Sequence, residues 1–138
     1  MEQRAPGHTV LDGKIYWKGM LDFKKDIREH FAIEEKVLFP VMKKVLKGEE
    51  LSLLLKIEEE HAPILNKLDG FSVVADNHTR YASKATREQM VQSACEIIEM
   101  VSAHASREDK LLFPLVGRHF RSEDLRELED LYFKFLKV

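Results

Sequence analysis

Two histidine–glutamate pairs with the same spacing are the residues of this chain best suited to chemistry. His30 is followed four residues later by Glu34, and His104 is followed four residues later by Glu108. Four residues make about one helical turn, so in a helix the imidazole and the carboxylate of each pair would share one face. An imidazole and a carboxylate offered together suit iron, zinc or manganese. The two pairs therefore predict one shared metal site with two halves.

Each pair opens a longer repeat. After the glutamate come a second acid, a lysine, an apolar residue and the tripeptide Leu-Phe-Pro, at residues 35–40 and 109–114. One pair alone would say little, because such pairs are common on solvated helix faces. The repeated tail indicates that both copies have the same structural setting.

Apolar residues at three- and four-residue steps predict helices and no strands of useful length. The first expected helix starts at residue 14 or 18 and ends at residue 46. Three further helices are expected at residues 49–68, 86–119 and 123–136. Pro40 should bend the first helix, because proline removes a backbone hydrogen bond. The candidate metal ligands all fall on apolar stripes: His30, Glu34, His61, His104 and Glu108.

The remaining stretches lack helical periodicity. Residues 1–13 are expected to form an irregular arm before a core at about 14–119, and Gly48 should end the first helix. Asp69-Gly70 should end the second helix, which leaves residues 70–84 as an exposed loop containing His78. His119 is also expected in solvent, too far along its helix to reach the site.

Burial of Glu34 and Glu108 would be costly without a positive partner. An unpaired carboxylate in an apolar core costs several kcal/mol, so it must be neutralised, paired or bound to a metal. The lysines and arginines of this chain fall mostly on the outer faces of the expected helices. Two divalent cations shared by the two carboxylates are the simplest way to balance this charge.

The repeat resembles that of the hemerythrin-like (HHE cation-binding) family over roughly residues 20 to 119. This resemblance implies an all-α, antiparallel up-down four-helix bundle. It implies two iron ions bridged by an oxo or hydroxo group, with zinc or manganese as possible replacements. Glu34 and Glu108 match the bridging carboxylates of the family, His30 and His104 match the terminal imidazoles, and His61 matches the single histidine of the helix between them.

The chain departs from the family at its front end. The family normally has another helix, with a histidine, before the first pair, whereas 29 residues precede His30 here. His8 is the candidate replacement, reaching the site from the arm. The C-terminal helix at 123–136 could take the place of the missing helix. Alternatively, a second copy of the chain could cover the same side of the bundle, and we predict a homodimer.

Three further acids invite comparison with the ligands. Glu35 and Asp109 directly follow the two site glutamates and are expected either in solvent or supporting a ligating histidine. Glu58 lies three residues before His61, which also resembles the ferritin-like pattern, but that class needs two such pairs and this chain offers one.

These features favour a protein that binds or senses O₂, NO or peroxide. The alternatives are an iron storage or delivery protein, including one that repairs iron–sulfur centres, and a structural or interaction module. A binding protein is favoured over an enzyme, because the chain has no Gly-x-Ser-x-Gly, no phosphate-binding glycine loop and no Cys-x-x-Cys.

Length and composition place further bounds on the protein. The 138 residues suit one domain, spanning 1–138. A net charge of -2 gives no indication of nucleic acid or membrane binding, and the apolar runs are too short for a membrane span. The single cysteine, Cys95, permits no internal disulfide, which favours a reduced, cytoplasmic compartment.

Overall fold

The computed structural model describes the backbone of residues 9–137 and the side chains of residues 19–137. Every regular element in this part of the chain is a helix, which confirms the predicted all-α class. The elements are α1 (Thr9–Ile33), η1 (Glu34–Leu38), α2 (Phe39–Val45), α3 (Gly48–Glu59), α4 (His61–Arg80), α5 (Lys84–Arg107), η2 (Glu108–Leu112), α6 (Pro114–His119) and α7 (Ser122–Leu136). No described helix is both long enough and apolar enough to cross a membrane.

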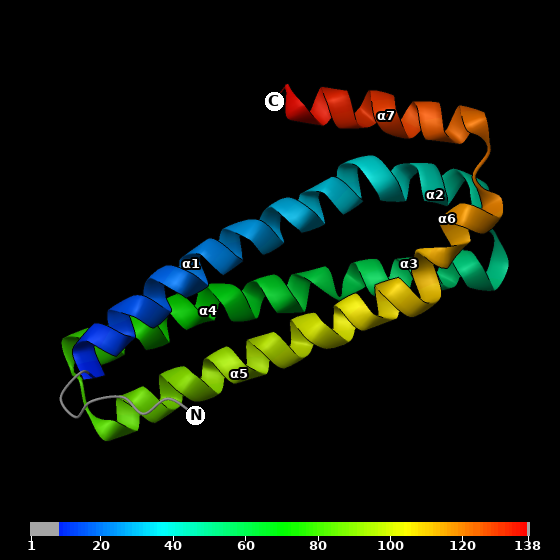
Figure 1. The fold of residues 1–138 in the computed structure, drawn as a ribbon. Coiled ribbons are helices and arrows are strands. Elements are labelled where there is room, and N and C mark those ends of the chain that lie inside the picture. The colour runs from blue at the N-terminus through cyan, green and yellow to red at the C-terminus, as the bar shows by residue number, and fades with distance from the viewer. Residues whose placement is uncertain (1–8, 138) are drawn as a thin grey trace.

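Successive helical arms run up and down beside one another (Figure 1). The first arm joins α1, η1 and α2, the second joins α3 and α4, and the third joins α5, η2 and α6. The second arm lies between the other two, since α4 packs against both α1 and α5. The final helix, α7, returns along the first arm and packs against η1 and α2.

The two repeats form π-helical turns directly before their prolines. In each, the N–H of the phenylalanine donates to the carbonyl five residues back, from Phe39 to Glu34 and from Phe113 to Glu108. A widened turn accommodates a proline that would clash with the preceding turn of an α-helix. The bend predicted at Pro40 takes this form, and Figure 1 shows the first arm changing direction between α1 and α2.

The first helix begins earlier than the sequence pattern predicts. Its first residue is Thr9 rather than 14 or 18, so residues 9–13, expected in the irregular arm, are helical. His8 lies outside the described residues. At the other end α2 stops at Val45, and Gly48 opens α3 with a φ of 60°, a left-handed conformation that glycine adopts without strain.

The prediction of a loop at residues 70–84 is wrong. Helix α4 passes through Asp69-Gly70 and ends at Arg80, because Phe71, Ala75 and His78 continue its buried stripe. His78, predicted in solvent, is fully buried, and its Nδ1 lies 2.8 Å from Oγ1 of Thr86. Thr86 also takes part in the capping box that starts α5.

Two apolar clusters form the core. They lie on either side of the layer that holds the π-helical turns. The cluster toward the α4–α5 connection contains Met20, Phe31, Ile64, Leu68, Phe71, Ala75, Met90, Ala94 and Ile97. The cluster toward the α2–α3 connection contains Phe39, Met42, Leu46, Leu54, Ile57, Leu112 and Leu115. The polar layer between them is therefore held from both sides.

Helix α7 is the least buried element. None of its residues is fully buried, although it starts as predicted near Ser122, where the backbone N–H of Arg121 donates to the Asp124 carboxylate at 2.9 Å. An ion pair between Lys44 and Glu127 ties it to α2. An apolar groove of about 560 Å³ remains between α1, η1 and the end of α7.

Candidate metal centre

Four side chains from the three arms meet in the polar layer. Glu34 comes from η1, His61 begins α4, His104 lies in the last turn of α5, and Glu108 begins η2. Each offers one nitrogen or oxygen, and these four atoms lie within 4.8 Å of one another. All four residues are 2–3% exposed. The structure thus brings together four of the residues that the sequence singled out.

These buried atoms lie close together without forming good hydrogen bonds. Nε2 of His61 lies 2.9 Å from Oε1 of Glu34, and Nε2 of His104 lies 3.1 Å from Oε2 of Glu108. None of these atoms has a hydrogen-bond partner of acceptable geometry among the described residues. Orphaned polar atoms in a core are costly, and a cation would satisfy them together. The chemistry of this donor set fits a divalent transition metal.

His30 lies beside this group, at the edge of the protein. Its Nε2 is 3.1 Å from Oε2 of Glu34 and 4.0 Å from Oε1 of Glu108, so it contacts both carboxylates. Its side chain is 57% exposed, whereas the side chain of His104 is 2% exposed. The first repeat therefore places its imidazole at the rim of the site.

Neighbouring histidines and carboxylates of the site shift one another's pKa values. The nearby carboxylates of Glu108 and Glu34 raise the pKa of His30 to about 10. Burial opposes the charge of Glu108, but the nearby imidazoles of His104 and His30 outweigh burial and lower its pKa well below the usual range. Burial likewise opposes protonation of His104, yet the nearby carboxylate of Glu108 and the hydrogen bond to Glu60 raise its pKa. The raised pKa of His30 favours its protonated form at neutral pH, and this charge balances part of the charge of the two carboxylates.

Two further carboxylates hold the buried imidazoles from behind. Nδ1 of His61 lies 2.6 Å from Oε2 of Glu35, and Nδ1 of His104 lies 2.8 Å from Oε1 of Glu60. Both imidazoles therefore turn Nε2 toward the cluster. The sequence predicted Glu35 to be either in solvent or in contact with a ligating histidine, and in the structure it contacts His61. Asp109, its counterpart, is exposed and forms no hydrogen bond or ion pair with the described residues.

Sequence reasoning did not single out Glu60. It ends the run Glu58-Glu59-Glu60 before His61, and such a run is typical of a solvated helix face. No spacing rule marks it, because its partner His104 lies 44 residues away. Its position directly before a candidate ligand is the one signal that was available.

Aromatic rings pack against the buried imidazoles of the site. Phe31 stacks on His61 with ring centroids 3.7 Å apart and planes at 4°, and it meets His104 edge-on at 5.2 Å. Phe39 lies 5.9 Å from the His61 ring. These rings fix the imidazole planes and keep water from them.

The other candidate residues lie elsewhere. Glu58 pairs with Lys43 at 2.9 Å, so the ferritin-like pair with His61 is not formed. His119 is remote from the site, as predicted, but its side chain is 32% exposed and its Nε2 lies 2.9 Å from Oε1 of Glu50. His78 is buried beside Thr86 at the α4–α5 connection.

Comparison with known proteins gives one match over most of the chain. Residues 18–116 match the hemerythrin HHE cation binding domain. A stretch of 27 residues is 74% identical to the trans-4-hydroxy-L-proline dehydratase of Clostridioides difficile, but it spans 20% of this chain and 3% of that enzyme. So short a match does not carry the activity of that enzyme to this chain. No solved structure matches at a significant level.

The matched range contains both repeats, the intervening His61 and both supporting acids. It covers well over half of the chain, and it encloses the whole buried cluster that could hold a metal. The chain belongs to the hemerythrin HHE cation-binding family.

Proposed function

We propose that this protein is a non-haem di-iron protein that binds O₂ or a related small molecule such as NO or peroxide. The observation that carries this proposal is the group of buried, unpaired donor atoms from Glu34, His61, His104 and Glu108. Carboxylate and imidazole ligands together suit iron, and also zinc or manganese. His8, which lies outside the described residues, stays a further candidate ligand.

The orientation of the two carboxylates supports two metal positions. Glu34 directs Oε1 to His61 and Oε2 to His30. Glu108 directs Oε2 to His104 and Oε1 to His30. Each carboxylate thus offers one oxygen to the buried histidines and the other to the exposed one. This arrangement suits two carboxylates shared between an inner position, with His61 and His104, and an outer position, with His30.

The two proposed positions differ in their access to solvent. The inner one has two buried imidazoles and aromatic walls, while the outer one has a single imidazole that is mostly exposed. Iron bound there would supply the redox chemistry and an open position for a small ligand. The residues of the chain hold the ions, exclude water from the inner side and leave the outer side accessible. Such a ligand-poor position favours a reactive site over reversible O₂ carriage.

Reconstitution with iron tests the proposal. Purified protein would be loaded with Fe(II) without oxygen and then exposed to air, and iron per chain and the optical spectrum would be measured. We expect two iron ions per chain and new absorption bands in the near-ultraviolet and visible. Zinc bound in place of iron, with no colour on iron loading, would contradict the proposal.

Matched variants connect this result to the cluster. Glu34→Gln and Glu108→Gln should each lose iron and the bands, because each removes a charge shared by both positions. Glu58→Gln is the control, since Glu58 pairs with Lys43 outside the cluster, and it should behave as the unaltered protein. Equal iron binding by all three variants would place the metal elsewhere.

Iron storage or delivery is a second candidate, and the exposure of His30 favours it. A metal held by one exposed imidazole and two shared carboxylates should leave more readily than one held by buried ligands. The rate at which a weak chelator removes iron distinguishes the two functions. Rapid loss of both ions would support delivery, whereas slow loss of at least one would support a fixed site.

We also propose that the chain forms a homodimer. Leu125, Phe133 and Leu136 of α7 are each more than half exposed, and apolar patches of this kind favour a partner. Sedimentation or light scattering would measure the mass in solution. A mass equal to one chain at micromolar concentration would contradict the dimer.

A further inference from the structure

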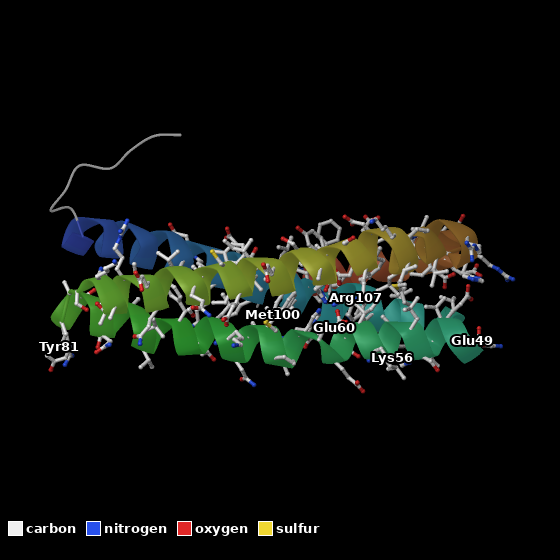
Figure 2. The ribbon with its side chains drawn as sticks, turned by 90° about the horizontal axis from the view of Figure 1, so that it is seen from below. Glu49, Lys56, Glu60, Tyr81, Met100 and Arg107 are labelled. Atoms are coloured by element: carbon white, nitrogen blue, oxygen red, sulfur yellow. The ribbon has the colours of Figure 1, made fainter. Side chains whose placement is uncertain are left out.

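The Glu60 carboxylate joins a buried imidazole to a surface cation. Glu60 occupies the single-residue break between α3 and α4. Its Oε1 lies 2.8 Å from Nδ1 of His104, and its Oε2 lies 2.9 Å from Nε of Arg107, on the same helix as His104. Figure 2 shows Glu60 and Arg107 next to each other where α4 and α5 face one another. Three groups thus form a chain from solvent to the cluster.

The pair of Glu60 and Arg107 also forms part of the outer surface of the protein. Both residues line an apolar groove of about 350 Å³ between α4 and α5, together with Met100 (Figure 2). The side chain of Glu60 is 29% exposed and that of Arg107 is 44% exposed, whereas His104 behind them is 2% exposed. The pair therefore separates the groove from the buried cluster.

Arg107 has a definite effect on Glu60. Nε of Arg107 lies 3.2 Å from Oε1 and 2.9 Å from Oε2 of Glu60, so the guanidinium pairs with a charged carboxylate. A charged carboxylate can only accept a hydrogen bond, so the Nδ1 of His104 must be the donor. Nε2, whose lone pair can bind a metal, is then left facing Glu108.

The same arrangement recurs one arm earlier, without the arginine. Glu35, next to Glu34, contacts Nδ1 of His61, and among the described residues it has no lysine or arginine partner. Glu60, next to His61, contacts Nδ1 of His104. In both cases the acid beside one cluster residue holds the histidine of the following arm. The supports therefore link the three arms in sequence.

We infer that Glu60 is a positioning residue, held in place by Arg107, that keeps Nε2 of His104 directed at the metal site. This inference rests on the proposed function, because it assumes that the cluster binds a metal. Partners that orient a ligating histidine typically contribute about 10–100-fold to metal affinity. Arg107, one contact further from the cluster, should contribute less than Glu60.

Zinc is a suitable probe because it is diamagnetic and accepts the same ligands. The affinity of the protein for Zn²⁺ would be measured by competition with a chelator, and the proton on Nδ1 of His104 would be followed by NMR in the zinc-loaded protein. Glu60→Gln should weaken zinc binding by about 10–100-fold and shift the Nδ1 proton signal upfield. Arg107→Gln should move both in the same direction by less, and Arg107→Lys should restore them.

Glu59→Gln is the matched control, because Glu59 is the exposed neighbour of Glu60 and should leave both readouts unchanged. If Glu60→Gln does not fold by circular dichroism, the two Arg107 variants decide the question, since they alter an exposed side chain. Unchanged zinc affinity and an unchanged Nδ1 signal in Glu60→Gln would overturn the inference while leaving the metal site intact. Failure of the unaltered protein to bind zinc or iron would instead overturn the proposed function.

Discussion

The two repeats share their sequence pattern but differ in their surroundings. His104 is buried, and Glu60 holds its Nδ1, whereas His30 is mostly exposed and contacts the carboxylates through Nε2 alone. The difference comes from the neighbouring arms, because α3 and α4 supply Glu60 to one repeat and no described residue takes that place at the other. The repeat determines which ligands are offered, and the surrounding helices determine how firmly each is held.

The largest expected difference between the repeats is in metal binding. His104→Gln removes a buried, oriented donor and should weaken the binding of the first metal by more than about 100-fold, beyond the effect of a supporting residue. His30→Gln should leave one tightly bound ion per chain and remove the second. Isothermal titration with Zn²⁺ would count the sites and give their affinities. Equal losses in the two variants would show that the repeats are equivalent after all.

The second largest difference in metal binding is expected between the acids that directly follow the two site glutamates. Glu35→Gln should weaken zinc binding by about 10–100-fold, because Glu35 holds the buried His61. Asp109→Asn should leave the affinity unchanged, since Asp109 is exposed. The same chelator competition measures both variants. A loss in Asp109→Asn would reveal a partner for this residue in the metal-bound protein.

The pH dependence distinguishes the metal-free from the loaded protein. In the metal-free fold the pKa of His30 is raised from 6.5 to about 10, so its contribution to stability is complete below about 6.5 and is lost as the pH rises through about 10. At neutral pH a metal must displace this proton, and the apparent affinity of the outer position should rise with pH, by up to about tenfold per unit. His30→Gln should remove this slope, and its persistence there would assign the proton to another group.

The smallest effect on the metal should come from the remote histidine. Thr86→Val removes the hydroxyl that contacts His78 and accepts from the backbone N–H of Ser83 at the start of α5, and should lower the free energy of unfolding by about 1–2 kcal/mol. Iron content and spectrum should not change, because this contact lies at the far end of the bundle. Chemical denaturation and metal analysis of one preparation would measure both. A loss of iron would indicate that the two ends are coupled.

Much of the fold could be predicted from the spacing of apolar residues. The errors of that prediction arose where tertiary packing overrides a local sequence signal. The order of the helices was predictable because their stripes are long and regular. Asp69-Gly70 indicates a stop, yet Gly70 lies on the outer face of α4 while Phe71, Ala75 and His78 continue the buried stripe. Giving weight to that spacing over the glycine would have kept the helix and buried His78.

The buried cluster could also be predicted from the spacing of apolar residues, whereas the contact between Glu60 and His104 could not. Glu34, His61, His104 and Glu108 lie on apolar stripes, where a charged or polar residue requires a partner. Glu60 lies off such a stripe, and its contact with His104 depends on how far α4 is shifted along α5, which no local pattern records. The exposure of His30 likewise depends on which described helices pack beside it rather than on its own sequence.

The polar layer also divides the interior. One apolar cluster lies toward the α4–α5 connection, the other lies toward the α2–α3 connection, and the two π-helical turns sit where they meet. Without a metal, we expect the half at the α2–α3 connection to open while the other half stays folded. Metal binding would connect all three arms at this layer, so the two unfolding transitions expected without a metal should become a single cooperative one.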